Sequence, residues 1–303
     1  MCFRLQSGSA SLNGFEIPRT WLKGLSDCAN RPLSVVRVAM DDNDNGAGSA
    51  DHEPFYPAAV RVLVLSKTAG YRHESIPSGI AALHRLGSTS SVPVVAHATE
   101  DSRDLLGISP AEYHVVVLLQ TSGDFLDAAE LAALRAYARA GGGIVGIHCA
   151  AAGMPPGEGG SGNAVDGDGW YARGLIGAAF AGHPEPQWGV VRVADPEHPI
   201  LARGKGLSSM EKPAEGGALE WKWYDEWYNF HTNPRDNNHV LLTCDESSFE
   251  GGTMGEDHPL AWCREVDGMR SFYTALGHFD EAYTDETFMA HILNGILWSA
   301  RRI

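Results

Sequence analysis

The sequence predicts an α/β fold with a mostly parallel sheet and helices on both of its faces. Short apolar runs such as Val60–Leu65 and Val115–Leu119 alternate with longer segments that have helical spacing. Apart from Arg61 these runs are apolar and do not alternate with polar residues, which is typical of parallel strands that are buried on both faces. Binding sites in such sheets lie beyond the carboxyl ends of the strands. We therefore expect the loops 67–74, 120–124 and 148–153 to meet at one edge.

The first half of the chain supplies most of this pattern. Strands are expected at 60–65, 92–96, 115–119 and 144–147. The first helix is expected to begin after Ser75, with Pro77 at an early position where its missing N–H is not needed. The second, Ala128–Arg139, follows Asp127 and places three apolar residues on one face: Leu131, Leu134 and Tyr137.

The second half is less regular, and it follows a long Gly-rich loop at 153–169. It predicts a helix over 170–180 and strands at 190–193, 240–243, 260–264 and 271–276. Residues 205–217 resemble an exposed insertion. The chain closes on an amphipathic helix, 288–300, whose inward residues are Ile292, Ile296 and Trp298.

Residues 1–58 differ in composition from the rest and are interpreted as a tail. Within them, residues 40–52 are acidic and Gly-rich with little apolar surface to pack, so disorder is expected there. The remainder, 59–303, is predicted to be one α/β domain.

The net charge indicates which partners are not expected, and the cysteines indicate the cellular compartment. The formal net charge of −15 would repel phosphate backbones and anionic lipids, so neither nucleic acid nor a membrane is an expected partner. Five cysteines without paired spacing do not suggest a disulfide framework. No secretory signal is recognisable in the first residues. We expect a cytoplasmic protein, and the sequence leaves homo-oligomer formation open.

The segment from Gly141 to Gly153 predicts a strand that turns sharply into a helix. Such a turn needs small residues two positions before and after the residue at its tip. Gly146 and Ala150 have this spacing around His148, whereas Ile147 and Ala151 flank Cys149. The residue at the tip is therefore predicted to be His148. The alternative is a buried strand end with a structural histidine and an inert thiol.

Thirteen histidines are present, and four of them fall in loops that could meet: His73, His148, His183 and His278. Imidazole exchanges protons near neutral pH and also binds metal ions. Neither His-Glu-x-x-His nor Cys-x-x-Cys occurs, so no known metal motif supports the second role. The spacing alone does not decide between them.

A second group of candidate residues lies at 221–230, where six aromatic residues surround Asp225 and Glu226. Aromatic rings stack on sugars while carboxylates bind hydroxyl groups, so Trp227 and Tyr228 are expected to contact a carbohydrate. Strand alternation would place only one of the two carboxylates in the pocket. The alternative is an aromatic core strand whose acidic residues point to solvent. Lys67, in the loop after the first strand, is another candidate for substrate binding.

Several of these motifs, in the same order, closely resemble the ThuA-like (trehalose-utilisation) family. They are residues 66–76, the elbow up to His148, Leu-Ile-Gly-Ala-Ala-Phe-Ala-Gly-His183-Pro, Asp225-Glu-Trp-Tyr-Asn-Phe and Tyr-Thr-Ala-Leu-Gly-His278. The resemblance covers about 60–301 and implies a flavodoxin-like sheet similar to class I glutamine amidotransferases. It also implies a role in the catabolism of disaccharides, including sugars oxidised at a ring hydroxyl.

The chain departs from an amidotransferase at two positions. That superfamily has cysteine at the tip of the elbow and a His-x-Glu pair downstream, whereas this chain has His148 and a pair ending in Asp280. Glutamine hydrolysis is therefore not expected. A nucleophilic set of Cys149, His278 and Asp280 is the least favoured hypothesis.

The leading hypothesis is an enzyme that acts on a glycoside or keto-sugar by proton transfer. His148, His73 and His278 would move protons, Glu226 or Asp225 would assist, and Trp227, Tyr228, His183 and Lys67 would bind the substrate. The second hypothesis adds a divalent metal such as zinc, held by His73, His148, His183, His278 and Glu226. The third is a sugar-binding or sensing protein without catalysis.

Overall fold

A computed structural model describes residues 11–12, 15–16, 58–90, 92–155, 157, 165–202, 207, 210–212 and 217–303. The chain divides into two units, Met1–Glu53 and Pro54–Ile303. In the first unit, β1 (Ser11–Leu12) pairs with β2 (Phe15–Glu16) in antiparallel orientation. The disorder expected at 40–52 lies outside the described residues, as does most of the predicted insertion at 205–217.

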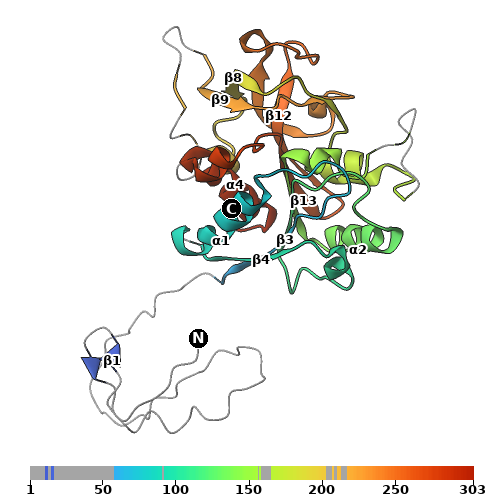
Figure 1. The fold of residues 1–303 in the computed structure, drawn as a ribbon, viewed down its shortest axis with the longest axis vertical. Coiled ribbons are helices and arrows are strands. Elements are labelled where there is room, and N and C mark those ends of the chain that lie inside the picture. Colours follow the sequence, from blue (N-terminus) through green and yellow to red (C-terminus); the bar gives the residue numbers. More distant parts are fainter. Residues whose placement is uncertain are drawn as a thin grey trace. The chain divides into compact units, whose positions relative to one another are not determined.

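The second unit contains a nine-stranded sheet whose first half is parallel. When the five parallel strands are numbered among themselves along the chain, their spatial order is 2-1-3-4-5, which is the flavodoxin-like order. This half confirms the predicted α/β class with a parallel sheet (Figure 1). Its strands are β4 (Val94–Thr99), β3 (Val60–Leu65), β5 (Val115–Leu119), β6 (Gly143–Ile147) and β13 (Met269–Thr274).

The sheet continues beyond β13 with antiparallel strands, whose orientation the sequence did not predict. In spatial order they are β12 (His258–Val266), β11 (His239–Asp245), β8 (Gln187–Val193) and β9 (Glu220–Asp225). Residues 267–268 join β12 directly to β13, and antiparallel neighbours of this kind need no crossover helix. A small separate sheet pairs β7 (Phe180–Gly182) with β10 (Asn229–Phe230).

Helices cover both faces of the parallel half, as predicted (Figure 1). Helices α1 (Ile76–Thr89) and α4 (Glu286–Ser299) lie on one face, and α2 (Ala128–Arg139) lies on the other. Helix α2 begins at a capping box between Asp127 and Glu130, a device that stabilises a helix by about 1 kcal/mol. Shorter helical segments are α3 (Pro199–Ala202), η2 (Ser102–Leu105), η3 (His148–Ala152), η5 (Trp170–Ile176), η6 (Pro234–Asp236), η7 (Glu246–Ser248) and η8 (Asp280–Thr284).

The helix predicted over 170–180 is shorter than expected. It is the π-helical turn η5, which ends at Ile176 because Gly177 adopts a left-handed φ of 98°. Phe180 then enters β7 instead of continuing the helix. The apolar residues predicted to face the core on α2 and α4 are all buried, and Leu134 and Ile296 are fully so. None of the described helices combines the length and the hydropathy that crossing a bilayer requires.

Candidate active site at the carboxyl ends of the parallel strands

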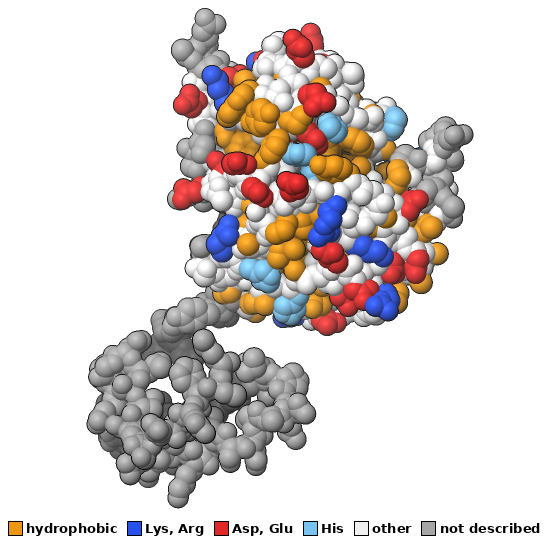
Figure 2. Space-filling model, in the orientation of Figure 1, with side chains coloured by type: hydrophobic (Ala, Val, Ile, Leu, Met, Phe, Trp, Pro, Cys, Tyr) orange, Lys and Arg blue, Asp and Glu red, His pale blue; other side chains and the backbone are white. Residues whose placement is uncertain are grey.

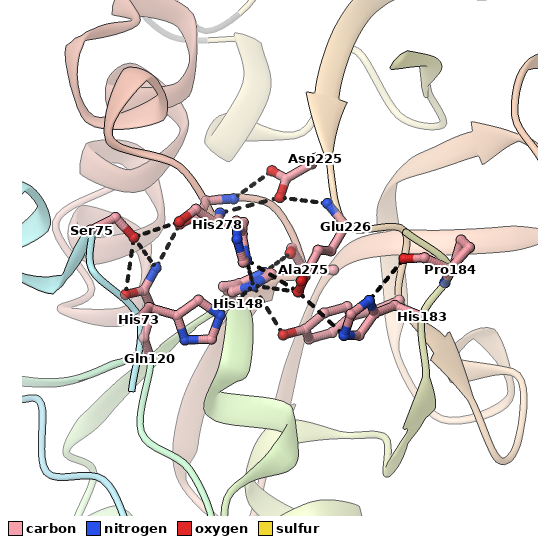
Figure 3. A network of polar contacts seen from close by, with 12 residues as sticks. His73, Ser75, Gln120, His148, His183, Pro184, Asp225, Glu226, Ala275 and His278 are labelled. Atoms are coloured by element: carbon pink, nitrogen blue, oxygen red, sulfur yellow. Dashed lines mark hydrogen bonds and ion pairs between the residues drawn. The ribbon is translucent and has the colours of Figure 1, made fainter. Parts of the chain in front are cut away.

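Three of the histidines identified from the sequence follow parallel strands and meet at one edge of the sheet. His73 lies in the loop after β3, His148 directly follows β6, and His278 follows β13. Their ligand nitrogens and a carboxylate oxygen of Glu226, which follows β9, all lie within 4.8 Å of one another. We call these four residues the histidine cluster (Figure 3).

His148 occupies the tip of a sharp turn between β6 and η3, as the sequence predicted. Its φ of 52° lies in the left-handed region, which is uncommon for a residue with a side chain. A Cβ added at Gly146 would lie 3.4 Å from the Cβ of Ala150 and 3.0 Å from Ile176. The two small residues therefore permit the close approach that holds His148 in this conformation.

His148 is at the centre of the cluster. Its Nε2 lies 3.1 Å from Nε2 of His73, 3.2 Å from Nδ1 of His278 and 3.3 Å from Oε2 of Glu226. The hydroxyl of Tyr228 lies 3.0 Å from the same nitrogen. One ring nitrogen can satisfy only one of these four neighbours with a hydrogen bond. Neighbouring ligands of an ion with bonds of about 2.0–2.2 Å lie roughly 3 Å apart, so this spacing fits a metal site.

Backbone carbonyls determine which nitrogen of two rings carries the proton. Nδ1 of His148 lies 2.6 Å from the carbonyl of Ala275, and Nδ1 of His183 lies 2.9 Å from that of Pro184. A carbonyl only accepts, so Nδ1 donates in both rings and Nε2 is the nitrogen that remains for other partners. Both Nε2 atoms face Oε2 of Glu226, His183 at 3.5 Å (Figure 3).

Burial and neighbouring charges shift the pKa values of two members of the cluster, His73 and Glu226. Burial, together with the charges of His148 and His278, lowers the pKa of His73 to about 3, so this ring is neutral at physiological pH. Burial also disfavours the ionised form of Glu226. The hydrogen bonds and charges of His148 and His278 outweigh burial and hold the pKa of this carboxyl well below its usual range. Glu226 is therefore an anion beside neutral His73.

Tyr228 is a protonated phenol that points its hydroxyl at the cluster. Burial raises its pKa well above the usual value, so the hydroxyl can donate to Nε2 of His148. Its backbone carbonyl lies 2.8 Å from Nε2 of His258, whose other ring nitrogen lies 2.7 Å from Glu246. This buried pair holds the Tyr228 backbone in place. Sequence reasoning missed His258, because His-Pro dipeptides usually belong to turns.

Asp225 does not enter the cluster but positions two of its members. Its carboxylate accepts from the backbone N–H groups of Gly277, His278 and Glu226, at 2.8, 3.2 and 2.9 Å. It also accepts from the indole of Trp223 at 2.7 Å. The hypothesis that the acidic residues here point to solvent is wrong, since Asp225 and Glu226 are both buried.

Gln120, which the sequence analysis did not identify, holds the same loop from the opposite side. Its Nε2 donates to the carbonyl of Gly277 at 2.7 Å, while Ser75 donates to that of His278 (Figure 3). Gln120 is fully buried and has a left-handed φ of 52°. A glutamine that ends a buried strand was the available signal. The loop bearing His278 is thus fixed by side chains from three elements.

Two predicted substrate-binding residues lie away from the cluster. Trp227 is fully buried, stacks on Phe249 with ring centroids 4.9 Å apart, and donates to the carbonyl of Gln187. It is therefore a core residue and is not placed to stack on a sugar. Lys67 donates to Ser102 at 2.6 Å and lies 3.9 Å from Glu130, next to the capping box of α2.

The thiol next to the turn is poorly suited to nucleophilic attack. Cys149 is buried, and burial raises its pKa to about 11, so the thiol stays protonated at neutral pH. Asp280, the acidic member of the hypothetical thiol set, is exposed at the start of η8. Neither observation favours glutamine hydrolysis.

Solved structures with this fold include a ThuA-like protein from Bacteroides uniformis, which is 22% identical. The match covers 83% of this chain and 95% of that chain, with a TM-score of 0.59. A ThuA-like protein from Parabacteroides merdae is 20% identical over 80% of this chain and 90% of that chain, with a TM-score of 0.53. No curated protein matches the sequence.

The family model described as "Trehalose utilisation" matches residues 61–299. That range includes every strand of the nine-stranded sheet except the first residue of β3, and all four members of the histidine cluster. The chain therefore belongs to the ThuA family, within the class I glutamine amidotransferase-like superfamily.

Proposed function

We propose that this protein is a divalent-metal-dependent enzyme that acts on a carbohydrate. The observation that carries the proposal is the convergence of three imidazoles and one carboxylate, whose ligand atoms all lie within 4.8 Å of one another. Nε2 of His148 lies 3.3 Å from Oε2 of Glu226, and Nε2 of His183 lies 3.5 Å from the same oxygen. In both rings the Nδ1–H group donates to a backbone carbonyl. A cation bound among these groups would accept imidazole lone pairs and neutralise the carboxylate.

The donor set supports a metal ion as that cation. Three imidazoles and one carboxylate are ligands that zinc and related first-row ions prefer. The Nδ1–H bond from His148 to the Ala275 carbonyl is the outer contact that usually orients a metal-bound imidazole. His73, His148, His278 and Glu226 would hold the ion. This arrangement favours the second sequence hypothesis over proton transfer by histidines alone.

The remaining residues would serve the reaction. A bound divalent ion would supply Lewis-acid polarisation of a carbonyl or hydroxyl oxygen. His183 lies beside Glu226 with about one third of its side chain exposed, so it can exchange a proton with a bound substrate. The protonated hydroxyl of Tyr228 can donate to an oxygen that gains negative charge.

A carbohydrate substrate is supported by the family description, trehalose utilisation. Within that class we propose a disaccharide or a keto-sugar. Sugars of this kind offer vicinal hydroxyl or keto oxygens to a divalent ion. The net charge of −15 does not favour polyanionic substrates such as nucleic acids.

Elemental analysis of protein purified without an affinity tag tests the metal. We expect about one divalent ion per chain in the wild type, and loss of that ion in His148→Ala and Glu226→Gln. Glu256→Gln, which changes an exposed carboxylate, is the matched control and should keep the ion. Metal-loaded protein is then incubated with trehalose and with trehalose oxidised to a ring ketone, and new species are detected by NMR.

Two results would contradict the proposal. The first is a chain that takes up no zinc, manganese, nickel or cobalt on dialysis. The second is turnover that persists in metal-free protein after chelation, which would return the chemistry to the histidines alone. Ligand-induced thermal stabilisation without any product would instead indicate a sugar-binding protein.

A further inference from the structure

We propose that Trp188, Tyr224 and Phe279 form a platform that binds a sugar ring of the substrate outside the histidine cluster. This inference rests on the proposed function, since it specifies a carbohydrate of two or more linked rings. We call these three residues the aromatic platform. One ring of the glycoside would lie at the cluster and the next would stack on the platform.

The two exposed rings of the platform are cross-strand neighbours. Trp188 on β8 pairs directly with Tyr224 on β9, so both side chains project from the same face of the sheet. Their ring centroids are 5.5 Å apart and their planes are inclined by 59°. Trp188 is 66% exposed and Tyr224 is 40% exposed. Large rings left in water beside a candidate site favour a binding role over a structural one.

The platform is continuous with the histidine cluster. The ring of Tyr224 lies 5.2 Å from that of Phe279, which lies 4.3 Å from the ring of His278. Tyr224 also directly precedes Asp225 and Glu226. In Figure 2, hydrophobic side chains gather over the region of β8 and β9, and histidine side chains lie beside them. The distance between the centroids of successive rings is comparable with the length of one pyranose unit.

Exposed aromatic rings are concentrated around this site. Among the described residues, the large hydrophobic side chains that remain exposed are Tyr71, Val95, Leu106, Trp188 and Tyr224. Three of these five are aromatic: Trp188 and Tyr224 belong to the platform, and Tyr71 borders the histidine cluster. Tyr71, 65% exposed, has its ring 4.7 Å from that of His73, on another part of the rim.

Polar groups next to Trp188 complete the chemistry that a sugar needs. A surface hollow of about 390 Å³ is lined by Trp188, Lys222 and Ser248, together with Gly189 and Val190. The negative face of an aromatic ring attracts the C–H groups of a pyranose. The ammonium of Lys222 can donate to sugar hydroxyls at the edge of the stack.

A protein partner fits these observations less well. Stable interfaces bury about 800 Å² on each partner and involve about 20–30 residues a side, far more than three rings supply. Charged side chains flank the platform on the same face: Lys222 on β9, and Arg192, which forms an ion pair with Glu220 at 3.0 Å. A polar surround with a few exposed rings is typical of a carbohydrate-binding surface.

Sugar binding to metal-free protein tests the platform separately from catalysis. Dissociation constants for trehalose, maltotriose and cellotriose are measured by NMR titration and calorimetry. We expect at least one of these sugars to bind the wild type, and its dissociation constant to rise about tenfold or more in Trp188→Ala and in Tyr224→Ala. Trp188→Phe keeps a flat ring and should retain most of the affinity. Leu106→Ala, which removes an exposed apolar side chain elsewhere, should change nothing.

The outcomes separate this inference from the proposed function. If His148→Ala loses the metal but keeps its affinity for the sugar, the platform acts independently of the cluster. The inference is overturned if no sugar binds the wild type, or if both ring-removing variants bind as tightly as the wild type. A dimer of the wild type in light scattering would also overturn it, if Trp188→Ala is a monomer and binds the sugar as tightly as the wild type. Unchanged melting temperatures of the variants exclude misfolding as the cause of a loss.

Discussion

At the scale of single residues, two buried histidines show how surroundings decide the role of an imidazole. His148 has a carbonyl on Nδ1 and four polar neighbours around Nε2, so its ring is oriented and ready to bind a cation. His291, on α4, is buried against Phe272, and neither ring nitrogen has a hydrogen-bond partner among the described residues. The first ring is the one that we propose binds a metal ion, while the second behaves as an apolar core side chain.

His291 should make the fold sensitive to acid. Burial lowers its pKa to about 3, so between about pH 6.5 and pH 3 the unfolded chain binds a proton that the folded chain does not. Stability should therefore fall as the pH decreases through this range, by up to about 1.4 kcal/mol per pH unit from this group. In His291→Met, denaturant unfolding should show a shallower pH dependence than in the wild type, with similar stability at pH 7.5.

His84, exposed on α1, provides the matched control. His84→Met should leave the pH dependence of the wild type unchanged, because it replaces a histidine whose side chain lies outside the core. His73, whose pKa is lowered in the same direction, contributes equally to all three proteins. Parallel curves for His291→Met and the wild type would contradict the assignment.

At the scale of elements, the histidines of the cluster follow the carboxyl ends of parallel strands, and neighbouring loops fix the positions of their side chains. The sharp turn after β6 raises His148, and Gly277, with a φ of 114°, turns the chain after β13 toward His278. A Cβ at Gly277 would lie 3.0 Å from Phe288 and 3.2 Å from the Tyr283 hydroxyl. Asp225, at the end of β9, joins the two halves of the sheet through the loop that bears His278.

Asp225→Asn tests this positioning role. The amide nitrogen would face backbone N–H donors, so at least one hydrogen bond to Gly277, His278 or Glu226 would be lost. We expect a loss of about 1–3 kcal/mol in the free energy of unfolding and about 10–100-fold weaker metal binding. Calorimetric metal titration and denaturant unfolding measure the two effects.

Asp280→Asn changes an exposed carboxylate at the start of η8 and serves as the control. It should alter neither quantity. Wild-type metal affinity in Asp225→Asn would show that the loop bearing His278 keeps its place without this carboxylate. A purely structural role would lower stability alone.

At the scale of the whole molecule, the sheet and the site belong to one compact unit. The contact division places Pro54–Ile303 in that unit, and the family model begins at residue 61. All four residues of the histidine cluster and all three of the aromatic platform lie after residue 70.

A chain that starts at Pro54 after an initiating Met should keep the fold and the site of the full chain. Its core, its sheet and the proposed ligands are all retained, so we expect the same melting temperature within about 2 °C and the same metal content. Circular dichroism melting and elemental analysis compare it with the full-length protein. Aggregation of the shortened chain, or loss of its metal, would show that residues 1–53 contribute to the unit.

The sequence by itself determined the parallel half of the sheet. The runs Val60–Leu65 and Val115–Leu119 and the helix Ala128–Arg139 match the structure residue for residue. Local chemistry encodes them, through apolar strands and the Asp127 cap. The residue at the sharp turn was also predictable, because Gly146 and Ala150 have the small side chains that the crowded backbone requires.

Tertiary structure alone decided which side chains serve the site. Glu226 and Tyr228 face the histidines, whereas Trp227 between them is covered by Phe249, and a one-dimensional pattern of alternation cannot tell which face will be covered. Gln120, Asp225 and His258 act through hydrogen bonds to residues 30 or more positions away in the chain. Trp188 meets Tyr224 only because β8 pairs with β9. Contacts between distant segments form only when the sheet assembles, so no local signal in the chain records them.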